Sequence, residues 1–113
     1  MTKVIYYTTT TKENPAMAFL RSLNEKQQRK IIRILTNIEV YGLSTAIPHT
    51  KKLTGTPLWE IRILGQDNIR VLYIIEEQDM IIILHGFIKK AQKTPLKEIQ
   101  TALQRLKELE NTK

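Results

Sequence analysis

The chain has 113 residues, of which 42% are hydrophobic and 26% charged, a composition typical of one folded domain spanning residues 1–113. Lys and Arg outnumber Asp and Glu by 18 to 11, so the formal net charge is +7, which favours a phosphate-rich or acidic partner. The absence of cysteine excludes disulfides, thiolate catalysis and Cys-ligated zinc or iron–sulfur clusters. No apolar run approaches the ~20 residues of a membrane span, and the first residues lack an apolar signal core, so we expect a soluble cytoplasmic protein.

The first part of the chain predicts one strand followed by two helices. Residues 3–7 are mostly β-branched and aromatic, as in a strand. An Asn-Pro pair then begins a short helix over residues 15–22. Asn24 and Gln27 form a capping box for a second helix, whose apolar residues recur at helical spacing until Gly42 ends it.

The second part of the chain predicts three strands and a last helix. Residues 43–57 contain proline, glycine and hydroxyl residues, so we expect a loop. The runs 58–64, 69–75 and 80–87 are rich in β-branched residues, and short polar turns separate them, as in consecutive antiparallel strands. A Thr-Pro pair at 94–95 then caps and begins an amphipathic helix.

The resulting order β-α-α-β-β-β-α predicts an α+β fold, in which two helices pack on one face of an antiparallel sheet. The other face would be partly open. The last helix would either cover the edge of that face or protrude and offer an apolar seam to a partner.

Two arginines on neighbouring predicted strands are the first candidates for a functional site. Strand alternation places Arg62 and Arg70 beside a short turn, and cross-strand neighbours on one face lie ~5 Å apart. Two guanidiniums this close repel each other unless an anion lies between them. They form either a clamp on a phosphate, which suits the planar fork of arginine, or an ion network neutralised by Glu60, Asp67 or Asp79.

Lysines adjoin the same predicted strands at both ends. Lys51 and Lys52 precede the strands, and Lys89, Lys90 and Lys93 follow them. An isolated lysine cluster is usually a solvated surface. With the two arginines, however, this part of the chain carries seven basic residues, a combination that indicates a polyanion site better than any one cluster does.

The histidines and aromatic residues give weaker signals. His85 lies inside the most apolar run, where a hydrogen-bonded core histidine is more common than a catalytic one. The chain has no metal-ligand spacing, nucleophile elbow or glycine-rich phosphate loop, so we expect neither a metal nor another cofactor. Trp59 and Phe87 are expected in the core, although an aromatic ring at the rim could stack on a base.

Four short motifs between residues 51 and 95 resemble those of the RelE/ParE superfamily of toxins, and the resemblance extends over nearly the whole chain in length and in the order of the predicted elements. The motifs are KKLTG at 51–55, LWEIR at 58–62, RVLY at 70–73 and HGFIKKAQKTP at 85–95. The chain looks most like the HigB-type branch of type II toxin–antitoxin systems, also described as phage-derived Gp49-like proteins. The resemblance implies a RelE-like fold and a toxin that cuts messenger RNA in the ribosomal A site. It also implies a HigA-like helix-turn-helix antitoxin, which sequesters the toxin and binds operator DNA only as the complex.

The resemblance also implies roles for individual residues. Lys52, Arg62, Arg70 and Lys90 match basic residues of the family's site. We expect Arg62 and Arg70 to hold the scissile phosphate, and Lys52 or Lys90 to act as base or acid. Further RNA contacts are expected from residues near this set, namely Lys51, Lys89, Lys93 and Trp59.

Two positions depart from the RelE pattern. Thr54 stands where the prototype has a further basic residue, and Leu96 stands where it has a tyrosine. His85 or Lys93 could compensate for these losses, and His85 could do so only if its ring faces the open side of the sheet.

Two other functions fit the same chain. A ParE-like toxin shares the fold and inhibits DNA gyrase, but it largely lacks the basic positions that this chain keeps. A non-catalytic binding module of a toxin–antitoxin repressor complex would use the basic face only for docking. We expect no membrane partner in any of these cases.

Overall fold

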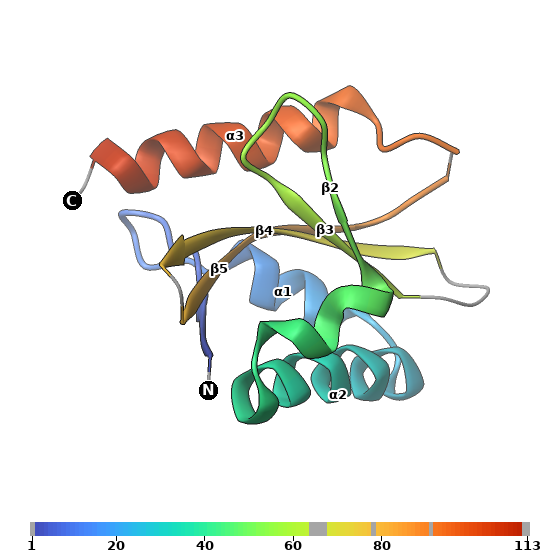
Figure 1. The fold of residues 1–113 in the computed structure, drawn as a ribbon. Coiled ribbons are helices and arrows are strands. Elements are labelled where there is room, and N and C mark those ends of the chain that lie inside the picture. Colours follow the sequence, from blue (N-terminus) through green and yellow to red (C-terminus); the bar gives the residue numbers. More distant parts are fainter. Residues whose placement is uncertain (1, 64–67, 78, 91, 112–113) are drawn as a thin grey trace.

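The computed structural model describes residues 2–63, 68–77, 79–90 and 92–111, which fold around one central sheet (Figure 1). The sheet has five strands in the order β1-β5-β4-β3-β2. The strands are β1 (Lys3–Tyr6), β2 (Thr50–Lys52), β3 (Trp59–Ile63), β4 (Ile69–Glu77) and β5 (Met80–Ile88). The helices are α1 (Pro15–Ser22), α2 (Glu25–Tyr41), the 3₁₀ helix η1 (Leu43–His49) and α3 (Leu96–Asn111).

The predicted α+β class is confirmed, with one difference in the sheet. Strands β2 to β5 pair antiparallel in succession, as expected. Strand β1 instead pairs parallel with β5, so that Ile5 lies opposite Ile82. Because β4 occupies one edge of β5, the N-terminal strand fills the other, and the two helices between β1 and β2 allow the parallel direction.

The loop prediction for residues 43–57 is wrong in its first ten residues. Helix η1 packs against α2 and buries Ala46 completely. Strand β2 pairs with β3, and the hydroxyl groups of Thr50 and Tyr73 are hydrogen-bonded at 2.8 Å. Three residues carry no readable alternation, so the sequence alone does not reveal a strand that depends on its partner.

Helices α1 and α2 begin where their caps predict. The Asn14 side chain accepts from the backbone of Met17, and Asn24 and Gln27 form both bonds of a capping box. Gly42 follows α2 with φ 97°, a conformation that favours glycine. Local chemistry therefore sets the start of both helices and the end of α2.

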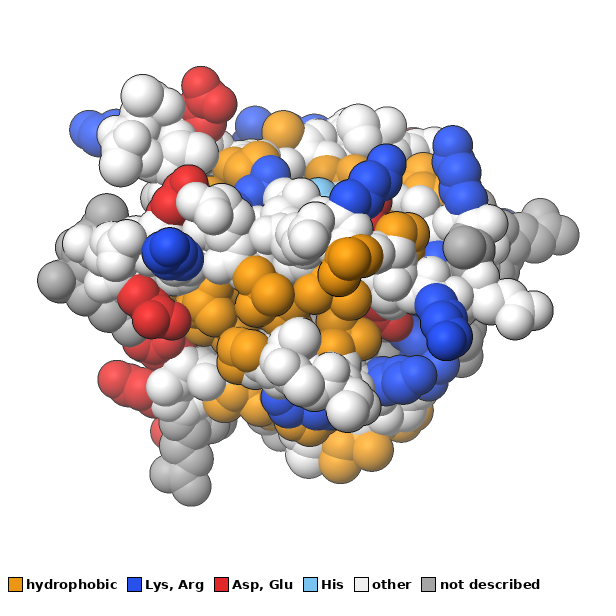
Figure 2. All heavy atoms as spheres, turned by 90° about the horizontal axis from the view of Figure 1, so that it is seen from above, with side chains coloured by type: hydrophobic (Ala, Val, Ile, Leu, Met, Phe, Trp, Pro, Cys, Tyr) orange, Lys and Arg blue, Asp and Glu red, His pale blue; other side chains and the backbone are white. Residues whose placement is uncertain are grey.

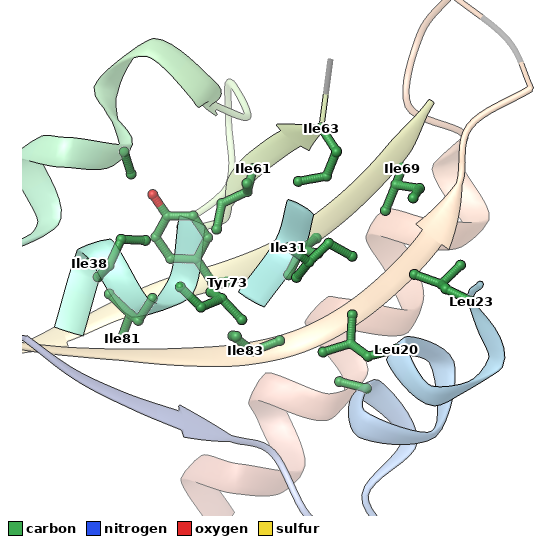
Figure 3. Close-up of a cluster of buried hydrophobic side chains, with 14 residues drawn as sticks. Leu20, Leu23, Ile31, Ile38, Ile61, Ile63, Ile69, Tyr73, Ile81 and Ile83 are labelled. Atoms are coloured by element: carbon green, nitrogen blue, oxygen red, sulfur yellow. The ribbon is translucent and has the colours of Figure 1, made fainter. Parts of the chain in front are cut away.

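The face of the sheet that packs on α1 and α2 is a hydrophobic core (Figure 3). Ile31 and Ile38 of α2 meet Ile81 and Ile83 of β5, and Leu20 of α1 extends this cluster. All five side chains are buried. This face anchors the sheet on which the candidate site is built.

Helix α3 lies across the other face of the sheet (Figure 1). Ala102 and Leu106 are buried there against Leu72, Leu84 and Phe87. Of the two predicted alternatives for the last helix, the structure therefore shows the one in which it covers the sheet.

Two predicted turns lie partly outside the described residues, at 64–67 and 78. Strands β4 and β5 extend slightly beyond the runs predicted for them, to Glu77 and Ile88. Among the described helices, none is both long and apolar enough to span a bilayer.

Candidate functional site

A pocket of about 590 Å³ opens between the β2–β3 edge of the sheet and the segment that joins β5 to α3. Among the described residues that line it, five are positively charged and one is a carboxylate. The cations are Lys51, Lys52, Arg62, Lys89 and Lys93, and the carboxylate is Glu60. This composition favours an anion that carries more than one charge.

The surface around α3 is also positively charged at the end where the pocket lies. Figure 2 shows Lys and Arg side chains gathered at the end of this face where β5 leads into α3, whereas Asp and Glu gather mainly at the opposite end. Hydrophobic side chains lie between the two groups. A polyanion approaching this face is therefore attracted to the pocket end.

Arg62 and Arg70 lie directly opposite each other in the pairing of β3 with β4, as strand alternation predicts. Both face the α3 side of the sheet, because their neighbours Glu60 and Leu72 are also paired and Leu72 belongs to the α3 core. Arg62 lines the pocket. Arg70 is only 9% exposed and is not among the described residues that line the pocket.

Both arginines have a buried Nε–H for which no described residue is a hydrogen-bond acceptor. A buried donor without an acceptor costs about 1–3 kcal/mol. The Arg70 guanidinium makes one hydrogen bond through Nη1, which donates to the backbone carbonyl of Ile69 at 3.0 Å. Burial lowers the pKa of Arg70, and Arg62 lowers it further, whereas Glu60 opposes both effects. Of the two, only Arg62 lines the pocket, so its guanidinium is the one that an anion in the pocket can approach.

Glu60 provides the ion network that the sequence allowed as an alternative. Its side chain is 2% exposed, and Oε1 lies 3.6 Å from Arg70 Nε. Its Oε2 accepts a hydrogen bond from the hydroxyl of Thr94. Asp79 lies at a separate hollow with Lys3, and Asp67 is outside the described residues. Glu60 therefore balances Arg70 from one side, while Arg62 keeps access to the pocket.

The lysines divide between the pocket and its surroundings. Lys51 lies opposite Glu60 in the pairing of β2 with β3, and Lys89 and Lys93 line the opposite wall. Lys90 is exposed and is not among the described residues that line the pocket. The structure thus brings Lys51, Lys89 and Lys93 together with Arg62 and leaves Lys90 outside.

Lys52 reaches the pocket from the edge of the sheet. It lies opposite Trp59 in the strand pairing, and its ammonium is 5.7 Å from the centre of the Trp59 ring. The same ammonium donates to the backbone carbonyl of Thr56. Trp59 packs against the core under α1 and α2, as expected for a core aromatic residue. Stacking of Trp59 on a base would need its exposed rim.

His85 lies beneath α3 and does not line the pocket among the described residues. Its Nε2 is 2.9 Å from Glu98, and its Nδ1 is 3.1 Å from Arg105 Nη1. Because Arg105 only donates, Nδ1 accepts and Nε2–H donates to Glu98. Burial lowers the pKa of His85 and Arg105 lowers it further, while the bond to Glu98 raises it. His85 is thus a hydrogen-bonded neutral histidine, the more common of the two interpretations.

Sequence reasoning missed the hydrogen bond between Thr94 and Glu60. Thr94 was expected to cap the last helix, but α3 begins at Leu96 and the Thr94 hydroxyl donates to Glu60 instead. The available signal was an acidic residue between Leu58 and Arg62, on the strand face whose other members are buried or basic. In the part of the chain that the structure describes, no group of His, Asp or Glu could hold a metal ion.

The fold and the pocket define a small basic α+β protein with an anion site beside its last helix. The chain belongs to the family described as phage derived protein Gp49-like (DUF891), whose sequence profile matches residues 18–107. This is a family of RelE/HigB-like toxins associated with toxin–antitoxin systems. The match covers the pocket, from Lys51 to Ile99. The chain matches none of the curated proteins with which it was compared.

Proposed function

We propose that this protein is the toxin of a type II toxin–antitoxin system, a ribosome-dependent endoribonuclease that cuts messenger RNA and arrests translation in the cytoplasm. The observation that carries the proposal is the buried Nε–H of Arg62, unpaired in the described structure and set in a pocket lined by four lysines. Membership of a toxin family supports it. A HigA-like helix-turn-helix antitoxin is the proposed neutralising partner.

The proposed reaction uses the nucleophile that RNA itself carries. The 2′-oxygen attacks phosphorus, forming the O2′–P bond while the P–O5′ bond breaks. The proton of the 2′-hydroxyl passes to a base, and an acid protonates the leaving 5′-oxygen. The products are a 2′,3′-cyclic phosphate and a 5′-hydroxyl. Cations that stabilise the charge on the non-bridging oxygens allow this chemistry without a metal.

In this proposal Arg62 binds the scissile phosphate, because it lines the pocket and its planar fork matches two phosphate oxygens. Arg70 acts from the neighbouring strand, where its buried charge strengthens the positive field at the same phosphate. Lys51, Lys89 and Lys93 bind neighbouring phosphates. Electrostatic stabilisation by one such donor is typically worth about 10²–10³ in rate.

Proton transfer is assigned to a lysine. Lys52 lines the pocket and would have to leave the Thr56 carbonyl and the Trp59 ring, whereas Lys90 must turn inward from an exposed position. His85 would have to break its contacts with Glu98 and Arg105 first. Lys52 is therefore the best placed of the three expected groups.

The test compares Arg62→Ala with Arg33→Ala, which removes an exposed arginine on α2. Purified protein is added to ribosomes programmed with a message, and new 5′ ends are mapped. We expect Arg62→Ala to lower the cleavage rate by about 10²-fold or more, and Arg33→Ala to leave it unchanged. Equal rates for Arg62→Ala and wild type would remove Arg62 from the mechanism.

The wild-type result separates the three candidate functions. New RNA ends support the endoribonuclease. A DNA damage response without RNA ends would instead indicate a gyrase inhibitor. RNA binding with neither outcome would indicate a binding module. Arg62→Lys, which keeps the charge and loses the fork, should retain part of the activity if charge and geometry both contribute.

A further inference from the structure

We propose that Glu60 and Thr94 form a clasp that holds one wall of the pocket against β3, which makes Glu60 a positioning residue for RNA cleavage. This wall carries Lys89 and Lys93 and is called the lysine-bearing wall below. The inference rests on the proposed function, since it concerns the same pocket. It assigns a role to the one carboxylate among the described lining residues.

The burial of Glu60 requires an explanation. Its side chain is 2% exposed, and a buried carboxylate is stable only when charged or hydrogen-bonding partners compensate for lost water. One oxygen faces Arg70 on β4, and the other accepts from Thr94, 34 positions along the chain. Lys51 lies opposite Glu60 on the other neighbouring strand. Three separate segments therefore converge on this carboxylate.

Thr94 holds one end of the lysine-bearing wall. Lys89 is fixed by its backbone N–H, which donates to the carbonyl of Asn68 at 2.8 Å. Thr94 is fixed by its hydroxyl on Glu60. Lys93, which lines the pocket, directly precedes the Thr94 anchor. Release of the Thr94 hydroxyl would let this lysine move away from Arg62.

The geometry favours positioning over proton transfer. A base must reach the 2′-hydroxyl, but the Glu60 carboxylate is almost fully buried and each oxygen already faces a partner. It acts through those partners, because it offsets the repulsion between Arg62 and Arg70 and fixes Thr94. A glutamine in its place can keep an oxygen acceptor for Thr94, but it loses the charge and turns an amide NH2, which only donates, toward Arg70.

The first measurement needs neither RNA nor ribosomes. Backbone ¹⁵N relaxation gives order parameters for the Lys93 amide in wild type, Thr94→Val, Thr94→Ser and Thr101→Val. Thr94→Val should lower the order parameter of the Lys93 amide from about 0.85, the value of rigid backbone, toward about 0.6. Thr94→Ser should restore the higher value. Thr101→Val is the matched control, because that hydroxyl bonds to Lys97 within α3. An unchanged value in Thr94→Val would overturn the clasp.

The second measurement follows cleavage on programmed ribosomes at varied toxin concentrations. Thr94→Val should raise the half-saturating concentration about ten-fold and change the maximal rate less, since a bond to a charged group is lost outside the reacting atoms. Thr94→Ser should return to the wild-type value, and Thr101→Val should not depart from it. A Thr94→Val variant with wild-type saturation would contradict the inference.

Glu60 variants then separate positioning from base catalysis. Glu60→Gln should keep the maximal rate within about ten-fold of wild type, whereas loss of a true base lowers it about 10²–10⁴-fold. Glu60→Ala and Thr94→Val should not add, because each breaks the same bond. Additive effects, or loss of the maximal rate in a folded Glu60→Gln, would overturn the proposal. If wild type makes no RNA ends, the proposed function fails, while the relaxation data still test the clasp.

Discussion

The face of the sheet that packs on α1 and α2 and the face that packs on α3 differ in what they bury. The first buries a continuous hydrophobic cluster in which the Tyr73 hydroxyl is paired with Thr50. The second buries a smaller cluster and, beside it, a glutamate and an arginine. Buried charges contribute little to stability, so we expect the first face to contribute more to the stability of the fold, while the second face, beside its smaller core, places charges at the pocket.

The largest expected effect is on the first face. Ile81 is fully buried there, and Ile81→Ala should lower the free energy of unfolding by about 2–5 kcal/mol, because the lost contacts leave a cavity. Ile75→Ala is the control, since Ile75 is 39% exposed. Urea denaturation measures both. Similar losses in the two variants would show that this core is not the main source of stability.

A second test on the first face concerns the close approach of α1 to β5. A methyl group at Gly86 would lie 2.4 Å from Cδ2 of Phe19, so Gly86→Ala should lower the free energy of unfolding by about 1–3 kcal/mol. Phe19→Leu in the same protein should recover part of the loss, because it makes room for the methyl group. Thermal unfolding of both single variants and the double variant measures the coupling. Strictly additive losses would contradict the proposed clash.

The sequence predicts the elements of the first face well, because their signals are local. Caps at Asn14 and Asn24 and the glycine at position 42 determine where helices start and stop. It does not predict the parallel pairing of β1 or the short strand β2. Those elements depend on partners far along the chain.

The site is predictable only in part for the same reason. Alternation places Arg62 and Arg70 on one face, as the structure shows. It cannot tell that Arg70 is buried or that Lys90 lies outside the pocket. The burial of Arg70 depends on the strands paired with it on both sides, and the position of Lys90 depends on how the segment after β5 turns toward α3.

A smaller loss of stability is expected when the cap of α2 is removed on the first face. Asn24 caps α2 with its side chain, and Asn24→Ala should lower the free energy of unfolding by about 1 kcal/mol, because a backbone N–H loses its acceptor. Asn37→Ala, an exposed position within the same helix, is the control. Urea denaturation and the RNA cleavage assay are applied to both variants. A loss of cleavage in folded Asn24→Ala would show that the two faces are not separable.

The smallest expected effect is a pH dependence on the second face. Burial keeps the pKa of His85 below its ordinary value of about 6.5, so the folded protein binds its proton less readily than the unfolded chain does. The free energy of unfolding should therefore begin to fall as the pH approaches about 6.5 and should fall mainly below it, where the unfolded chain binds the proton and the folded protein does not. It should level off once the folded protein is protonated as well. Protonation also removes the acceptor for Arg105, whose guanidinium then faces a like charge. Urea denaturation across this range should show the fall in wild type and His49→Gln, and a weaker fall in His85→Gln. An equal pH dependence in His85→Gln would assign the effect to other groups.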